Sequence, residues 1–265
     1  MRKPALVVSD LDGTLIKPNT AALEPRTLEL VEGLLDAGIP FMPASGRQHP
    51  NVRWLFEPLA ERLSFVSENG VLAHIGHELV YRATLERDLG LEIVRTILER
   101  PNCEPMVSGE KTYYITPESP TFLRYLEEGC GFVVTRVDDL EDIGEPYGKL
   151  SAFYPEGLGD DRFFWTERFG SRCTVTTSSD KWLDMMPSGV NKATALAVVL
   201  ERLGIDPADV IAFGDAENDV EMLKLVGCPI AKANGAPGAL ECALYTTDDV
   251  VSSLDHILNG PGYDW

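Results

Sequence analysis

The fold class of this 265-residue chain is indicated by the run Val7-Val8-Ser9-Asp10-Leu11-Asp12-Gly13-Thr14. Residues 5–8 form a short apolar run that ends in polar residues, which is typical of a buried parallel strand. If the chain stays extended beyond this strand, Asp10 and Asp12 point to the same side. Gly13 then permits a tight turn and lets an anion approach the backbone N–H groups. We therefore expect two carboxylates at the carboxyl end of a strand, with a cation between them.

Helical and strand-like patterns alternate before and after residues 84–185. The first part has a helical pattern at 24–36, followed by strand-like runs at 39–44 and 64–66. The alternation resumes in the last part, with helices expected at 192–203, 218–225 and 250–258 and strands at 210–213 and 229–231. This order predicts an α/β fold with a doubly wound, Rossmann-like parallel-sheet core.

The order changes within residues 84–185. A hairpin expected at 71–82 leads into this segment, which mixes strands and helices in an α+β pattern. Helices are expected at 87–99, 120–128 and 160–169, and strands at 111–116, 132–135, 149–154, 172–177 and 181–186. We therefore predict a core made of 1–83 and 186–265, interrupted by an inserted α+β domain at 84–185.

A second acidic cluster, Gly214-Asp215-Ala216-Glu217-Asn218-Asp219, follows the strand expected at 210–213. Its carboxylates also come at the carboxyl end of a strand, where they would lie beside Asp10. A hard cation with oxygen ligands accounts for such a concentration of acids. The alternative is an acidic helix N-terminus, which explains one acidic residue well and the whole cluster poorly.

Two further groups could bind an anion. Ser45 offers a hydroxyl, and Gly46 and Arg47 offer backbone N–H donors, which together suit a phosphate oxygen. The alternative for Ser45 is an ordinary helix cap. Lys192, at the start of the helix after the insert, could stabilise a transferring phosphoryl group, although an isolated lysine is usually a solvated surface residue.

Composition narrows the possible partners. The formal net charge is −19, so we expect the surface to repel nucleic acid and anionic membranes. The five cysteines are odd in number and form no CxxC pair, which favours reduced thiols over a disulfide framework or a zinc site. No apolar stretch is long enough for a signal-peptide core or a membrane span, so we expect a cytoplasmic protein. His74 and His77 lack the cysteine or carboxylate pattern of a further metal site.

Four parts of the chain, taken in sequence order, resemble the motifs of the haloacid dehalogenase (HAD) superfamily of phosphatases and phosphomutases: the stretch after Asp10, the group around Ser45, the segment ending at Lys192, and the acidic cluster that begins at Gly214. Residues 10–15 match its first motif, 44–47 its second, 189–192 its third and 214–223 its fourth. The position and pattern of the insert resemble the cap of the Cof-type group, subclass IIB. Residues 67–70, Ser-Glu-Asn-Gly, look like that group's third-strand loop. The resemblance spans essentially the whole chain.

The resemblance implies a reaction and a magnesium ion. Asp10 would attack phosphorus and form an aspartyl-phosphate, while Asp12 would protonate the leaving oxygen and then activate water. Mg²⁺ would be held by Asp10, the backbone carbonyl of Asp12 and Asp215. Asp219 would orient a metal-bound water or Lys192.

The same resemblance implies how the substrate is held. Ser45 and Lys192 would hold the phosphoryl oxygens, and Asn218 and Gly46 would assist. Gly13 and Arg47 complete the predicted binding set.

The expected substrate is a small phosphomonoester, with a sugar phosphate as the principal expectation. A phosphorylated glycosyl-glycerate, as in the mannosyl-3-phosphoglycerate phosphatase branch, and a phosphomannomutase-like transfer are alternatives. A non-catalytic binding module with this fold would be expected to lack Asp10, Asp12 or Asp215, and all three are present. The stretch 231–236 departs from the usual Cof-type pattern, and Lys232 could either add positive charge to the pocket or remain solvated.

Overall fold

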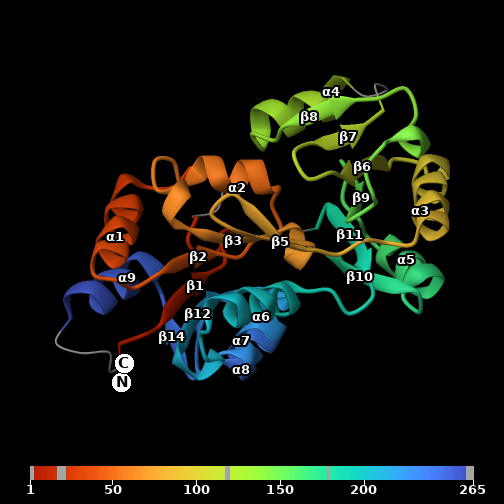
Figure 1. Ribbon diagram of the computed structural model, residues 1–265. Coiled ribbons are helices and arrows are strands. Elements are labelled where there is room, and N and C mark those ends of the chain that lie inside the picture. Colours follow the sequence, from red (N-terminus) through yellow and green to blue (C-terminus); the bar gives the residue numbers. More distant parts are fainter. Residues whose placement is uncertain (1–2, 17–21, 117–119, 178–179, 261–265) are drawn as a thin grey trace. The chain divides into compact units, whose positions relative to one another are not determined.

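The computed structural model describes residues 3–16, 22–116, 120–177 and 180–260 (Figure 1). These residues form two units. The first is drawn from Met1–Ser45, Val52–Tyr81 and Asn191–Trp265, and the second from Gly46–Asn51 and Arg82–Val190. The domain boundaries that the sequence suggests, with an insert at 84–185, remain a prediction.

The apolar run near the N-terminus forms β1 (Leu6–Ser9), which lies inside a parallel sheet of the first unit. The strand order is β14-β13-β12-β1-β2, and Ser9 is in register with Phe213 on β12 and with Pro43 on β2. The strand order therefore reverses beside β1, and ligands of such sheets bind at this switch point, beyond the carboxyl ends of the strands. The other strands are β2 (Phe41–Pro43), β12 (Val210–Gly214), β13 (Cys228–Lys232) and β14 (Tyr245–Thr247).

Helices cover both faces of this sheet (Figure 1). Leu6 and Val8 of β1 pack in a cluster with α6 and α7, whereas Val7 packs in another cluster with α1 and α9. Because side chains alternate along a strand, a strand covered on both faces is apolar throughout, which explains the unbroken run in β1. The helices that contribute to these clusters are α1 (Pro25–Asp36), α2 (His49–Leu55), α6 (Lys192–Leu203), α7 (Val220–Leu225), α8 (Pro237–Cys242) and α9 (Val250–Asn259). The doubly wound core that the sequence predicted is thus confirmed.

The third strand, β3 (Ser64–Ser67), belongs to a second sheet of the first unit. It pairs antiparallel with β4 (Leu72–Ile75), and the sheet has the order β3-β4-β5, with β5 at Glu78–Arg82. A parallel bridge between Ala44 and Val66 joins β3 to the chain that leaves β2. The carboxyl end of β3 therefore lies close to the segment that carries Ser45.

The second unit is built on a mixed sheet in the order β10-β11-β9-β6-β7-β8, in which β7 and β8 pair in parallel. Helices α3 and α5 pack in one apolar cluster with Trp165, and α4 packs in another with Phe153. This is the α+β architecture expected for the insert. Its elements are α3 (Arg87–Glu99), β6 (Glu104–Ser108), β7 (Tyr113–Ile115), α4 (Pro120–Arg124), a π-helical turn (Tyr125–Gly129), β8 (Val134–Arg136), β9 (Leu150–Phe153), α5 (Asp161–Phe169), β10 (Cys173–Thr177) and β11 (Trp182–Pro187).

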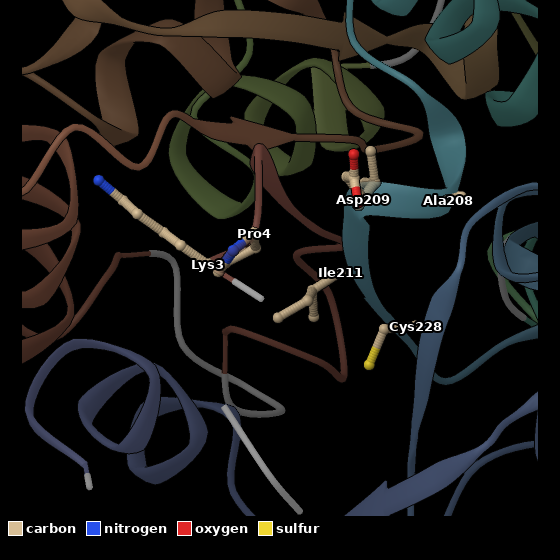
Figure 2. A pocket seen from close by; sticks show the side chains of 7 residues that line it. Lys3, Pro4, Ala208, Asp209, Ile211 and Cys228 are labelled. Atoms are coloured by element: carbon tan, nitrogen blue, oxygen red, sulfur yellow. The ribbon is translucent and has the colours of Figure 1, made fainter. Parts of the chain in front are cut away.

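A hollow of about 240 Å³ lies at the amino ends of the strands in the first unit (Figure 2). Figure 2 shows its lining side chains near the start of β1 and of β12. In a parallel sheet this edge is opposite to the carboxyl ends at which ligands bind, so the hollow lies away from Asp10. The lining residues are Lys3, Pro4, Ala208, Asp209, Val210, Ile211 and Cys228.

Candidate active site

Asp10 lies immediately beyond β1, where the sheet fixes its backbone. Its N–H donates to the carbonyl oxygen of Phe213 at 2.9 Å, which continues the β1–β12 pairing by one residue. The Asp10 side chain is buried. A carboxylate in this position needs positive or hydrogen-bonding partners, because burial without them disfavours its charged form.

Lys192 supplies the positive partner. It is the first residue of α6, which Asn191 caps by accepting a hydrogen bond from the N–H of Thr194 at 3.1 Å. Its Nζ donates to Asp10 Oδ1 at 2.5 Å and to Asp219 Oδ1 at 2.6 Å. Although burial opposes the charged ammonium, these two carboxylates outweigh it and raise the pKa of Lys192 above its usual range. With an exposed fraction of 0%, Lys192 is not the solvated surface lysine that the sequence left open.

Asp219 holds the turn after β12 in place. Its Oδ2 accepts hydrogen bonds from the N–H groups of Asp215 at 2.9 Å and Ala216 at 3.0 Å, while its Oδ1 accepts from Lys192. Gly214 makes this turn possible, because a Cβ there would come within 2.6 Å of the Asp219 Cβ. Both oxygens of Asp219 are therefore engaged by the protein itself, which suits it to orient its neighbours.

Asp215 is oriented by the turn that follows Asp10. Thr14 Oγ1 donates to Asp215 Oδ1 at 2.6 Å. Gly13 has a φ of +90°, and a Cβ there would come within 2.5 Å of Asp215 Oδ2. Burial raises the pKa of Asp215, and the Thr14 hydrogen bond opposes that shift. The sequence did not single out Thr14, although its hydroxyl stands in the same quoted stretch.

The three acids form a group that fits a metal ion. Asp10, Asp215 and Asp219 each offer a carboxylate oxygen, and these atoms all lie within 4.8 Å of one another. The pKa of Asp10 is raised well above its usual value, first by burial and then by the neighbouring carboxylates, with Lys192 acting in the opposite direction. A set of oxygen donors with excess negative charge is the environment that Mg²⁺ prefers. Because Asp219 is already engaged, Asp10 and Asp215 are the side chains best placed to hold the ion directly.

The structure places the other predicted residues at different points. Asp12 is exposed, in contrast to Asp10, and its charge contributes to the raised pKa of Asp10. Ser45 is buried, and its N–H donates to the Val66 carbonyl at 2.9 Å. Asn218 donates through Nδ2 to Asn69 Oδ1 at 3.0 Å, a contact that the sequence did not predict.

Gly46 and Arg47 belong to the second unit, and Arg47 Nη1 donates to Asn51 Oδ1 at 3.2 Å. Lys232 is directed to a backbone partner, since its Nζ donates to the carbonyl of Asp248. Within the described part of the chain, the acidic group around Asp10 is the one cluster of three or more possible metal ligands, so His74 and His77 are not part of another.

Three features together define a class of enzyme: the doubly wound α/β core, the α+β insert, and the paired acids at the switch point of the sheet. Residues 7–253 match the family of haloacid dehalogenase-like hydrolases, and the chain belongs to that family.

Several relatives of the chain are named as phosphatases. The chain is 30% identical to the HMP-PP phosphatase of Enterobacter sp. (strain 638), over 88% of this chain and 85% of the relative. It is 24% identical to the 5-amino-6-(5-phospho-D-ribitylamino)uracil phosphatase YbjI of Escherichia coli (strain K12), over 96% of each protein. Its fold is similar to that of the HAD subclass IIB sugar phosphatase BT4131, with a TM-score of 0.79, 17% identity and coverage of 95% of this chain and 98% of that one.

The chain is therefore a phosphatase of the haloacid dehalogenase-like hydrolase family, a phosphoric monoester hydrolase that acts on small phosphorylated substrates. Among the described residues, no helix combines the length and the apolar character that a membrane span requires. The expected family and enzyme class are thus confirmed.

Proposed function

We propose that the chain hydrolyses a small sugar phosphate through an aspartyl-phosphate intermediate on Asp10. The proposed cofactor is Mg²⁺, and the proposed location is the cytoplasm. The observation that carries this proposal is the buried Asp10 carboxylate, held at one oxygen by Lys192 and grouped with Asp215 and Asp219. A fixed, desolvated carboxylate at the carboxyl end of a central strand is well placed for nucleophilic attack.

The reaction has two steps. In the first, an oxygen of Asp10 attacks phosphorus, the bond from phosphorus to the leaving oxygen breaks, and Asp12 gives a proton to that oxygen. In the second, water attacks the same phosphorus, the bond to Asp10 breaks, and Asp12 takes the proton from the water. The contrast in burial supports this division, because the exposed Asp12 can exchange protons with substrate and solvent while Asp10 stays fixed.

The remaining residues hold the phosphoryl group. Lys192 has three N–H donors, and two of them serve Asp10 and Asp219, which leaves one for a phosphoryl oxygen. We assign Ser45 to the same role, with Asn218 assisting. When bound, Mg²⁺ would neutralise phosphoryl charge, held by Asp10 and Asp215 together with the backbone carbonyl of Asp12.

The assignment of Gly13, Gly46 and Arg47 to substrate binding also belongs to the proposal. The close approach of the Gly13 backbone to Asp215, which leaves no room for a Cβ, supports its assignment. Gly46 and Arg47 rest on the resemblance of residues 44–47 to the second motif of the family.

A direct test uses the nucleophile. Asp10→Asn should abolish Mg²⁺-dependent release of phosphate from p-nitrophenyl phosphate, and acid quenching with ³²P-labelled substrate should leave no label on that variant. Asp88→Asn is the matched control, since it removes an exposed acid from α3 in the second unit. Normal turnover by Asp10→Asn would contradict the mechanism.

The substrate is identified by comparing a panel of phosphorylated compounds. Sugar phosphates, a phosphorylated glycosyl-glycerate, HMP-PP and a phosphoribitylamino-uracil should be compared by kcat/KM, the last two because relatives carry those names. A clear preference for a compound other than a sugar phosphate would replace that part of the proposal. Incorporation of ¹⁸O from labelled water into the released phosphate would argue against a phosphomannomutase-like transfer.

A further inference from the structure

The turn after β3 has an unusual backbone. Glu68, Asn69 and Gly70 follow one another with φ values of 54°, 55° and 95°. This left-handed region suits glycine, is tolerated by asparagine and is unfavourable for glutamate. Nevertheless, the exposed fractions of Glu68 and Asn69 are 0% and 1%. A buried, strained turn persists only where its surroundings fix it, and such turns concentrate at functional sites.

The turn fixes the backbone of Ser45. The Ser45 N–H donates to the Val66 carbonyl of β3 at 2.9 Å. The Asn69 N–H, from the turn itself, donates back to the Ser45 carbonyl at 3.0 Å. Ser45 is thus held on both of its peptide groups by β3 and the turn that ends it, which limits how far its hydroxyl can move.

The same turn contacts the segments that carry Asn218 and Lys192. Asn69 Oδ1 accepts a hydrogen bond from Asn218 Nδ2 at 3.0 Å. Gly70 lies against the start of α6, where a Cβ would come within 2.0 Å of the Asn191 carbonyl oxygen and 2.9 Å of the Lys192 nitrogen. Three stretches that are distant in the sequence therefore meet at this turn.

We propose that Asn69 is a positioning residue for the phosphoryl group, acting through Ser45 and Asn218. Its N–H fixes the Ser45 backbone and its side chain fixes Asn218. Asn69 therefore sets the distance between these two residues, which follow different strands and bind the same phosphoryl group. This inference rests on the proposed function of Ser45 and Asn218. Small displacements of groups that orient a substrate lower the rate by about 10- to 100-fold, which is the loss expected when the side chain is removed.

Asn69→Gly is the most informative variant, because glycine keeps the left-handed backbone and removes the acceptor for Asn218. With p-nitrophenyl phosphate and Mg²⁺, its kcat/KM should fall by about 10- to 100-fold, and its inhibition by orthovanadate should weaken in parallel. Asn102→Gly is the matched control, since Asn102 also has a left-handed φ, of 57°, but is exposed and lies in the second unit. Its kcat/KM should match that of the wild type.

Asn218→Ala and the double variant test whether Asn69 acts through its hydrogen bond with Asn218. Since the two side chains act through one hydrogen bond, the double variant should be no slower than the more impaired single variant. The inference is overturned if Asn69→Gly keeps the wild-type kcat/KM, if the two losses multiply, or if Asn69→Gly loses activity only because its thermal midpoint falls far below that of Asn102→Gly. A wild-type protein without Asp10-dependent turnover would instead contradict the proposed function.

Discussion

Replacement of Lys192 by methionine removes the ammonium that two buried carboxylates share. Nζ lies 2.5 Å from Asp10 Oδ1 and 2.6 Å from Asp219 Oδ1, and Lys192 and Asp219 are both fully buried. Methionine fills most of the same volume without charge, so the main effect is electrostatic. Removing one partner of a buried ion pair costs about 3–5 kcal/mol, which corresponds to a fall of roughly 10 °C in the thermal midpoint of a chain of this size.

The measurement is the free energy of unfolding by urea, together with the thermal midpoint, in buffer with a chelator. Lys224→Met is the matched control, because Lys224 pairs with Glu221 at 3.0 Å on α7 with both side chains 54% exposed. That surface pair should contribute about 0.5 kcal/mol or less. The contrast between the two lysines thus isolates burial as the source of the effect.

A double-mutant cycle with Asp219→Asn tests the pairing itself. Without Lys192, the Asp219 charge has lost its partner, so neutralising it should cost less stability than it does in the wild type. The expected coupling energy is about 1–3 kcal/mol. Equal losses from Lys192→Met and Lys224→Met, or additive effects of the Lys192 and Asp219 substitutions, would refute the view that this network holds the site together.

Three further predictions concern single positions. Gly70→Ala should destabilise the chain by several kcal/mol, whereas Gly204→Ala, at φ +66° with no atom within 4 Å of the added Cβ, should cost only about 1–2 kcal/mol of backbone strain; equal losses in urea unfolding would contradict the close approach at Gly70. Burial lowers the pKa of His74 to about 4, whereas histidine in the unfolded chain titrates near 6.5, so the unfolded chain binds this proton more tightly. The contribution of neutral His74 to the free energy of unfolding is therefore complete above about pH 6.5 and decreases as the pH falls, by about 2 kcal/mol at pH 5. His74→Gln should flatten this part of the stability profile and the exposed His77→Gln should not, so unchanged profiles for both would contradict the assignment. Thr14→Val should raise the Mg²⁺ concentration for half-maximal activity by about 10-fold, because it removes the hydrogen bond that orients Asp215; an unchanged Mg²⁺ titration would argue against that role.

The sequence predicted the parts of the core that depend on local pattern. The apolar run of β1 and the glycines and acids behind it place Asp10 and Asp215 at the carboxyl ends of two strands, which are neighbours in the structure. Helix positions followed from their periodicity and ends, as in α1, where helix was expected at 24–36 and found at Pro25–Asp36. Such features require only short-range information about the chain.

Short elements and long-range contacts could not be predicted in this way. Helix α8 has six residues and β14 has three, so neither carries enough periodic pattern to be recognised, and packing on their neighbours defines them. The hydrogen bond from Thr14 to Asp215 joins residues 201 positions apart. The contact between Asn69 and Asn218 spans 149 positions, and nothing in the local sequence of either residue signals it.

The balance of charge around Asp10 connects the structure to the proposed chemistry. Asp10, Asp215 and Asp219 carry three negative charges when ionised, and Lys192 supplies one positive charge, which leaves a formal excess of −2 among groups that are buried or half-buried. Stability alone does not account for this arrangement, because apolar residues of similar volume replace buried ion pairs without loss in many proteins. A divalent cation would balance the excess, and it would also favour the ionised form of Asp10, whose pKa is otherwise raised. The excess negative charge that opposes folding in the absence of the ion is therefore what would attract the ion that makes Asp10 a competent nucleophile.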